Sequence, residues 1–377
     1  MLSAAVVIGT GWAWQQLRTF NDRVSVGAAV PSATGTSGAG DPKYVGKDQN
    51  ILLLGNDSRA GATPAELAAL GASEDGGSSN TDTMLVLHVP ADGSRATAIS
   101  FPRDSYVRIP GYGMDKLNAA YPDGYETAKS QGADEVGSQS AGIQVLIQTL
   151  SGLTGLHIDH YVQVNLLGFY RISIALQGVQ VCLEAPAQEP NSGINLPAGY
   201  STIEGKQALA FVRQRYNFPD GQGDLDRIRR QQYFLSAAFR KILSAGTLLN
   251  PGKLSNLLDA VSSSLLIDPD LNLLQLASQI SDLQAGNLNF YTIPTQGFDD
   301  NTPVGSVVVV DPTLVQQFVQ QTFYPPPVAT PNPGSTPSGA SSTDTTTPPP
   351  TDTGSPTLGD GSTVPTAVNA ADAGCIY

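Results

Sequence analysis

The chain has 377 residues, of which 40% are hydrophobic, and this suffices for one large or two ordinary domains. Its net charge of −13 argues against a general nucleic-acid-binding protein, which needs a basic face. The two cysteines, Cys182 and Cys375, exclude a cysteine-based zinc module and allow at most one disulfide. The composition therefore favours an acidic globular protein that has no nucleic acid as a partner.

The first residues are apolar. Residues 2–14 carry no charge and end in two tryptophans, a residue type that is typical of a membrane interface. The segment is shorter than the roughly 20 residues of a spanning helix, and it lacks the basic start of a secretory signal. We expect residues 1–23 to be a membrane anchor whose first part is missing from this sequence, and the alternative is a short buried helix. Residues 24–47 are expected to be a flexible linker.

Strand-like and helix-like segments alternate from residue 48 onward. The periodicity predicts strands in residues 50–61, 81–89, 95–110, 160–169, 178–186, 288–293 and 306–310. Helices are predicted in residues 113–121, 141–153, 253–264, 271–283 and 313–323, and residues 62–80 look like a flexible insertion. This alternation indicates an α/β (or α+β) fold with a central mixed sheet flanked by helices. Residues 324–377 are rich in Pro, Thr and Ser and are predicted to be a disordered tail.

One stretch, from Arg213 to Gln232, holds five arginines in an acidic chain. Arg213 and Arg215 follow an apolar run that we expect to be extended, so their side chains should point to the same side. Asp224 stands where a helix should begin, as its N-cap, and Arg227 and Gln231 lie four residues apart on one face of that helix. The pattern favours a site for several phosphate charges over the alternative of a solvated basic surface.

Acids and bases also occupy four turns at the ends of predicted strands. These turns hold Asp57 with Arg59, Asp82, Arg103 (followed by Lys116 and Asn118), and Arg213 with Arg215. Strand ends at one edge of a sheet converge, and α/β proteins commonly bind ligands there. Two carboxylates without a histidine or thiol partner suit Mg²⁺ or Mn²⁺, and the cationic side chains would neutralise a diphosphate.

Six motifs in order resemble the LytR-CpsA-Psr family of cell-envelope glycopolymer transferases, over residues 48–239. They are GNDSR, TDTMLVLHV, ISFPRDSYVRIP with KLNAAY, DHYVQVNLLGF, INLPAGYSTIEGKQALAFVRQRY and GDLDRIRRQQ. The resemblance implies a single-pass membrane protein whose catalytic domain, residues 48–323, lies outside the cytoplasm. It also implies transfer of a polyprenyl-diphosphate-linked glycan onto peptidoglycan as a phosphodiester, with the lipid in an apolar channel. Candidate lining residues, which core packing would equally explain, are Leu146, Leu150, Leu166 and Phe169.

The same resemblance implies roles for individual residues. Asp57 and Asp82 match the metal carboxylates. The diphosphate-binding set is Arg103, Lys116, Arg213, Arg215, Arg227 and Gln231, with Arg59 and Asn118 as secondary candidates. Arg215 is expected to be catalytic, and Asp82 or Asp224 to be the general base, because no histidine is available. The sequence departs from the family pattern at Asn80, where an arginine is common, and in the lengths of two connections, 57–82 and 215–224.

Other classes of function stay open. One is a membrane-bound polyprenyl-phosphate-binding or transcription-attenuating protein without turnover, although no helix-turn-helix pattern is seen. Another is a pyrophosphatase that uses water as the acceptor. The Ala- and Gly-rich composition looks actinobacterial, in which case arabinogalactan is the expected glycan. A disulfide between Cys182 and Cys375 would suit a compartment outside the cytoplasm, and the alternative is two free thiols.

Overall fold

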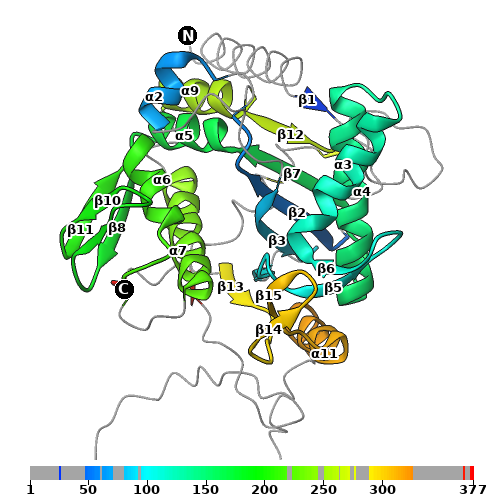
Figure 1. Ribbon diagram of the computed structural model, residues 1–377. Helices are drawn as coiled ribbons and strands as arrows, with labels where there is room; N and C mark the ends of the chain where they lie inside the picture. Colours follow the sequence, from blue (N-terminus) through cyan, green and yellow to red (C-terminus); the bar gives the residue numbers. More distant parts are fainter. Residues whose placement is uncertain are drawn as a thin grey trace, which may run out of the picture.

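Figure 1 shows the computed structural model of the chain. It describes residues 25–26, 47–59, 62–70, 80–91, 95–218, 223–244, 250–262, 264–271, 276, 288–325, 368–369 and 374–377. The expected membrane anchor, residues 1–23, lies outside this set, as does most of the helix expected at 271–283. Among the described residues, no helix combines the length and the apolar character that crossing a bilayer requires.

An eight-stranded mixed sheet forms the centre of the molecule (Figure 1). Its strands are, in spatial order, β1 (Ser25–Val26), β12 (Leu265–Ile267), β7 (His160–Asn165), β2 (Gln49–Asn56), β3 (Thr81–Val89), β4 (Ala96–Ser100), β13 (Leu288–Thr292) and β16 (Val368–Asn369). The pairs β1–β12, β7–β2 and β4–β13 are parallel and the other neighbours are antiparallel. The predicted fold class is therefore confirmed.

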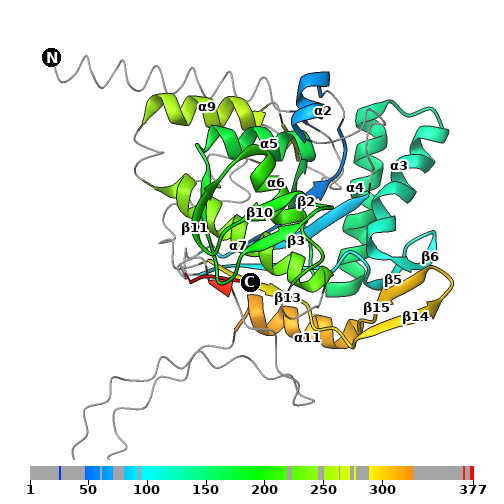
Figure 2. The same cartoon turned by 60° about the vertical axis from the view of Figure 1, so that its left-hand side comes forward.

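Alternate side chains of β2 enter two different cores, as the period of a strand requires. Leu52 and Leu54 are buried on one face and Ile51 on the other. The first face is covered by α3 (Ala120–Ser130), α4 (Glu135–Thr154) and α11 (Pro312–Phe323). The second face packs against α7 (Asp224–Leu243) through Leu235 and Phe239. Figures 1 and 2 show the resulting sandwich, with helices on both sides of the sheet.

A second core lies beyond α7. It is built by α5 (Leu166–Ala175), α6 (Gly205–Arg213), α9 (Pro251–Ser262) and two small antiparallel pairs, β8 (Val179–Leu183) with β11 (Gly199–Ile203) and β9 (Ala187–Glu189) with β10 (Ile194–Leu196). Phe211 of α6 and Tyr233 of α7 are buried in it, with ring centroids 6.4 Å apart. α7 therefore packs between the sheet and this second core.

The segment before Arg213 is a helix and not the extended run that the sequence suggested. Gly205, at φ 53°, turns the chain after β11, and α6 begins there. The five residues 208–212 are all buried, so the run is apolar on every side. A short run of this kind is compatible with a buried strand and a buried helix alike, and tertiary packing decides between them.

Four other segments also differ from the sequence prediction. Residues 113–116 form β6 (Gly113–Lys116), paired with β5 (Tyr106–Ile109), and the helix expected there begins only at Ala120. β7 ends at Asn165, whose Oδ1 accepts from the main-chain nitrogen of Gly168 and caps α5. The expected insertion contains α2 (Pro64–Leu70). In the expected linker, β1 pairs with β12.

The end of the chain is docked on β8 and α7, which corrects the prediction of a disordered tail for residues 374–377. Cys375 forms a disulfide with Cys182 of β8, with a Cα–Cα distance of 4.5 Å. Ile376 exchanges main-chain hydrogen bonds with β8 at 3.1 and 2.9 Å. On α7, Tyr233 Oη donates to the oxygen of Gly374, and Arg230 Nε donates to that of Tyr377. Most of the remaining tail lies outside the described residues.

His88 makes the stability of the fold depend on pH. It is buried at the end of β3, 4.7 Å from the ring of Phe323 and with Nδ1 2.9 Å from Oδ1 of Asn50. Burial lowers the pKa of His88 below its usual value near 6.5, although Asp48 and Asp159 oppose the shift. Below that pH the unfolded chain binds more protons, so we expect the free energy of unfolding to fall from pH 7 to pH 5.

Urea unfolding at pH 7, 6 and 5 tests this expectation. A His88→Gln variant should show a smaller loss between pH 7 and pH 5 than the parent chain. His157 provides the matched control because 80% of its side chain is exposed, and His157→Gln should keep the parent slope. An unchanged slope in His88→Gln would show that burial of this ring does not carry the pH dependence.

Candidate active site

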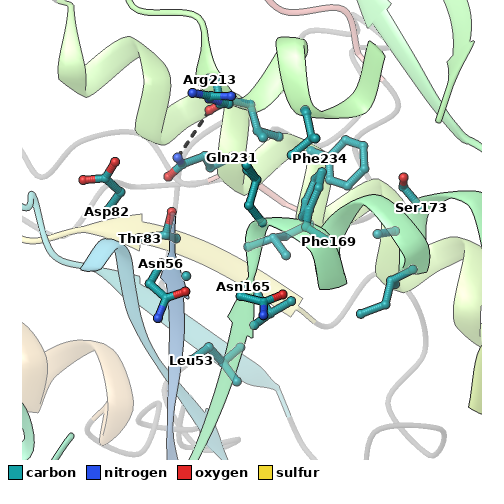
Figure 3. Close-up of a pocket in the computed structure, with 18 of the residues that line it drawn as sticks. Leu53, Asn56, Asp82, Thr83, Asn165, Phe169, Ser173, Arg213, Gln231 and Phe234 are labelled. Carbon is teal, nitrogen blue, oxygen red and sulfur yellow. Dashed lines mark hydrogen bonds between the residues drawn. The ribbon is translucent and has the colours of Figure 1, made fainter. Parts of the chain in front are cut away.

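The predicted carboxylates lie at neighbouring ends of two central strands. Asp57 directly follows β2, and Asp82 is the second residue of β3, the antiparallel neighbour of β2. Both line one cavity of about 680 Å³. Arg213 at the end of α6, with Arg215 just after it, lines the same cavity, and so do Arg227 and Gln231 of α7. Residues from distant parts of the sequence therefore share one cleft (Figure 3).

Most of the remaining cavity lining is apolar. Its lining includes Leu53, Val162, Val164, Leu166, Phe169, Ile172, Leu176, Phe234, Leu235, Ala238, Phe239, Ile242, Val261 and Leu265. Of the four residues considered for an apolar channel, Leu166 and Phe169 lie in this lining. Leu146 and Leu150 do not line the cavity. They belong to α4 and are fully buried in the core between this helix and the other face of the sheet. The cavity thus joins a charged rim to an apolar channel.

Helix α7 supplies one continuous face of this channel. The lining residues follow helical spacing, at Arg227, Gln231, Phe234, Leu235, Ala238, Phe239 and Ile242. The predicted pairing of Arg227 with Gln231 on one face is therefore seen in the structure. Asp224 is the first helical residue and not the N-cap, a position that Gly223 takes with φ 58°. Its carboxylate faces arginines instead.

Asp82 and Asp224 are linked through Arg103. Arg103 NH1 lies 2.8 Å from Asp82 Oδ1, and its Nε lies 3.6 Å from Asp224 Oδ1. Arg215 approaches Asp82 at 3.5 Å, and Arg227 approaches Asp224 at 2.8 Å. Arg227 also donates from NH2 to the main-chain oxygen of Asp82 at 3.4 Å. These five residues form a single charged network, although Arg103 and Asp224 do not themselves line the cavity.

Asp57 belongs to a second group of charges on the rim. Its Oδ2 lies 3.8 Å from NH2 of Arg59 and 4.0 Å from NH2 of Arg213. Each of the two predicted metal carboxylates therefore stands between two arginines. Arg59 does not line the cavity, so its contact with Asp57 makes it a neighbour of the site.

Lys116 and Asn118 are not part of the cavity lining. Lys116 Nζ lies 3.4 Å from Oδ1 of Asp104, and the main-chain nitrogen of Asn118 donates to the oxygen of Arg103 at 3.0 Å. Asp104 in turn lies 3.4 Å from Nε of Arg103. Lys116, through its side chain, and Asn118, through its main chain, thus support the turn that carries Arg103.

Sequence reasoning missed several polar residues of the site, four of which lie on or next to the strand ends. Asp104 bridges Arg103 and Lys116, and its place directly after Arg103 was the available signal. Asn56, Thr83 and Asn165 line the cavity from β2, β3 and β7 (Figure 3). Asn56 and Thr83 adjoin the two predicted carboxylates, so each was within one residue of a feature that the sequence did indicate. Asn165 lies inside the predicted strand 160–169, and no signal in the sequence marked it.

The buried arginines of the network stay cationic. Burial, together with the neighbouring Arg103 and Arg215, lowers the pKa of Arg227 to about 10, although Asp224 and Asp82 oppose the shift. Burial also acts against the charge of Arg103, but Asp82, Asp224 and Asp104 outweigh it, and the pKa is raised. Both side chains remain protonated at neutral pH, so the rim presents fixed positive charges to an anionic ligand.

The oxygen donors at this rim suit a hard divalent cation. Besides Asp57 and Asp82, the same lining contains the amide of Asn56 and the hydroxyl of Thr83. The described residues contain no group of three or more His, Cys, Asp or Glu side chains that could hold an ion by themselves. Mg²⁺ commonly uses one or two carboxylates and completes its shell with water and substrate phosphates. The residues therefore fit Mg²⁺ or Mn²⁺ held together with a phosphate ligand.

Comparison with known proteins gives a consistent assignment. "Cell wall biosynthesis protein LcpA" of Corynebacterium glutamicum is 43% identical over 288 residues, which cover 72% of this chain and 55% of that protein. The "Polyisoprenyl-teichoic acid--peptidoglycan teichoic acid transferase TagU" of Oceanobacillus iheyensis is 32% identical over 255 residues, covering 67% of this chain and 69% of that protein. This chain thus spans little more than half the length of LcpA.

A solved structure and a family model complete the comparison. The "LytR-Csp2A-Psr enzyme from Actinomyces oris" superposes with a TM-score of 0.56 at 20% identity, over 80% of this chain and 96% of that one, which supports the fold. The model of the LytR_cpsA_psr family matches residues 21–322, well over half of the sequence. The chain therefore belongs to the LytR-CpsA-Psr family.

Proposed function

We propose that this chain transfers a glycan from a polyprenyl-diphosphate carrier onto peptidoglycan as a phosphodiester. The observation that carries the proposal is the cavity, in which an arginine- and aspartate-lined rim opens into an apolar channel. A lipid diphosphate has this same division between a charged head and a hydrocarbon tail. The names of the relatives LcpA and TagU, which refer to cell-wall biosynthesis and to transfer onto peptidoglycan, support the same activity.

Each part of the cavity then has a task in the reaction. The apolar channel holds the lipid, and Arg213, Arg215 and Arg227 bind the diphosphate and orient it. A hydroxyl of a muramic acid unit attacks the sugar-proximal phosphorus. A phosphorus–oxygen bond forms to the acceptor, the phosphoanhydride bond breaks, and polyprenyl phosphate leaves. Asp82, which lines the cavity, accepts the hydroxyl proton, and Asp224, which does not line it, holds Arg103 and Arg227 in place.

Asp57 and Asp82 would hold Mg²⁺ or Mn²⁺ at this rim. When bound, the ion supplies positive charge that neutralises the diphosphate. The carboxylates fit this task because they face the cavity from adjacent strand ends and already lie among cationic side chains. The arginines share the neutralisation, and they do so from fixed positions.

The setting of the reaction is also a proposal. We infer a single-pass membrane protein with the domain of residues 48–323 outside the cytoplasm. The disulfide between Cys182 and Cys375 supports this inference, because such bonds persist in oxidising compartments. Arabinogalactan or a related cell-wall polysaccharide is the proposed glycan, which the 43% identity to a Corynebacterium protein supports.

A reconstituted reaction tests the proposed function. The purified chain is incubated with Mg²⁺, a lipid-diphosphate glycan and a peptidoglycan oligomer, and mass spectrometry is used to detect the joined phosphodiester. Hydrolysed carrier without a joined product would favour a pyrophosphatase. Tight binding of the carrier with neither product would favour a lipid-binding or regulatory protein.

Blocking the apolar channel should weaken lipid binding selectively. Ala238 of α7 lines the channel, and an Ala238→Phe substitution would fill part of it. We expect affinity for a polyprenyl phosphate to fall about tenfold, while affinity for inorganic pyrophosphate stays unchanged. Val136→Phe, at a position on α4 that is 46% exposed, is the matched control and should bind both probes normally. Equal weakening of both probes in Ala238→Phe would argue against a separate lipid channel.

A further inference from the structure

Arg230 of α7 is a buried arginine to which the proposed transfer assigns no task. It is 2% exposed and does not line the cavity, whereas Arg227, one turn before it, does. Within the described structure, Nη1 of Arg230 is buried and forms no hydrogen bond. Burial lowers the pKa of Arg230 to about 10, although Asp226 opposes the shift, so the side chain is cationic at neutral pH. Burying a cation costs free energy, and its presence here therefore needs a physical reason.

Two aromatic rings contact this cation. The Cζ atom of Arg230 lies over the ring of Phe211 and over that of Phe218, 4.9 Å from each ring centroid. Phe211 belongs to α6 and is fully buried, and Phe218 is 9% exposed. The electron-rich face of an aromatic ring attracts a guanidinium, and the attraction is largest where water is excluded, as it is here. Arg230 thus joins α7 to two rings that lie on either side of one short segment.

That segment carries Arg213 and Arg215, two of the cavity-lining arginines. α6 ends at Arg213, and residues 214–218 belong to no helix or strand. The two side chains are 40% and 37% exposed, and they approach Asp57 and Asp82 only at 4.0 and 3.5 Å. Ion pairs of this exposure and length hold a side chain weakly. The position of both guanidinium groups therefore depends on how the backbone of the segment is held.

Helix α7 holds the segment at both ends. Before it, Gln231 donates from Nε2 to the main-chain oxygen of Val212 at 3.3 Å (Figure 3). After it, Arg230 lies over the ring of Phe218. Arg227, the third cavity-lining arginine, is on the same helix. The double attachment therefore fixes the three arginines of the cavity relative to one another.

We propose, resting on the proposed function, that Arg230 is a positioning residue for Arg213 and Arg215. It holds Phe211 and Phe218, and the two rings hold the segment so that both guanidinium groups face the diphosphate before it binds. Donors that are fixed in advance need no rearrangement when charge develops on the phosphate oxygens. The contribution of Arg230 should therefore appear in phosphate binding and not in lipid binding.

Calorimetry with two probes tests this role. Inorganic pyrophosphate with Mg²⁺ reports on the arginines, and a short-chain polyprenol, which has no phosphate, reports on the channel. We expect Arg230→Met to bind pyrophosphate about tenfold more weakly and to bind the polyprenol as the parent chain does. Arg230→Lys keeps a cation over the rings and should stay within about threefold of the parent affinity for pyrophosphate.

Urea unfolding of the same variants separates positioning from stability. An apolar side chain of similar size can often replace a buried cation without loss of stability. Arg230→Met should therefore unfold at the urea concentration of the parent chain or above it, while its affinity for pyrophosphate falls. A purely structural arginine would instead lose stability and the affinity for both probes together.

A double-mutant cycle tests the contact itself in a chain that retains Arg230. Phe218→Leu should weaken pyrophosphate binding as much as Arg230→Met does. Combining the two changes should weaken it by no more than about a further twofold, because both remove the same contact. Additive losses would show that the two side chains act independently and would overturn the proposed role.

Tyr233→Phe is the matched control for the end of the chain, because Arg230 Nε also donates to the main-chain oxygen of Tyr377. Tyr233 Oη donates to the oxygen of Gly374, so this variant removes a contact with the same chain end and leaves Arg230 in place. It should keep the parent affinity for pyrophosphate. An equal loss in Tyr233→Phe, or parent affinity in Arg230→Met, would overturn the positioning role and leave the proposed function standing. Failure of the parent chain to bind either probe would overturn both.

Discussion

Arg215→Ala is expected to lower glycan transfer by at least about a hundredfold and to leave the fold intact. Arg215 lines the cavity and approaches Asp82 at 3.5 Å, so its guanidinium faces the proposed diphosphate. Removing one fixed donor to a developing charge commonly costs two to three orders of magnitude in rate. The side chain is 37% exposed and Asp82 keeps its 2.8 Å contact with Arg103. The free energy of unfolding should therefore change by less than about 1 kcal/mol.

The measurement is turnover in the reconstituted reaction, together with urea unfolding of the same preparation. Arg229→Ala is the matched control, since Arg229 lies on α7, is 52% exposed and contacts Asp226 and not the cavity. It should keep full turnover. Wild-type turnover in Arg215→Ala would remove this residue from the catalytic machinery, and a loss of folding would show that its role is structural.

Cys375→Ser is expected to lower the free energy of unfolding by about 2–4 kcal/mol. The bond to Cys182 spans 193 residues of sequence, so its loss frees a long stretch of the unfolded chain. It also weakens the docking of the chain end, which is then held by the main-chain hydrogen bonds of Ile376 and by one hydrogen bond each from Tyr233 to Gly374 and from Arg230 to Tyr377. We expect the largest loss of order along β8 and the middle of α7.

Urea unfolding without reductant gives the size of the effect, and hydrogen exchange gives its position. The parent chain in reductant is the control and should unfold at the same urea concentration as Cys375→Ser, which should itself be insensitive to reductant. Equal unfolding midpoints for the oxidised parent and the variant would contradict a stabilising role for the bond.

The parts of the fold that the sequence predicted well are those in which local pattern and tertiary role agree. β2 and β3 are apolar runs with turn residues at the ends, and both are central strands. The spacing of Arg227 and Gln231 needed only helical geometry to place both on the cavity. α6 was missed because its continuous apolar run has no period of its own, and its burial between other helices decides its conformation.

The site was predicted as a set of residues, but their contacts were not. Lys116 stands close to Arg103 in sequence, yet the pairing of β5 with β6 turns it toward Asp104 and away from the cavity. Asn56, Thr83 and Asn165 carry common polar side chains, and only the arrangement of the strand ends makes them part of the lining. The disulfide between Cys182 and Cys375 could be named as a candidate because the sequence has only two cysteines, and the structure forms it across a separation of 193 residues.

In the proposed reaction, α7 would set the depth of the channel for the carrier, because this helix lines the cavity from Arg227 to Ile242. Arg227, at the proposed diphosphate, and Ile242, the last lining residue of the helix, are separated by fifteen steps of helical rise, or about 23 Å. It follows that adding or removing one turn of this helix would change the reach of the channel by about 5 Å without altering the charged end. Prenyl chain length would then be selected by helix length, independently of the glycan.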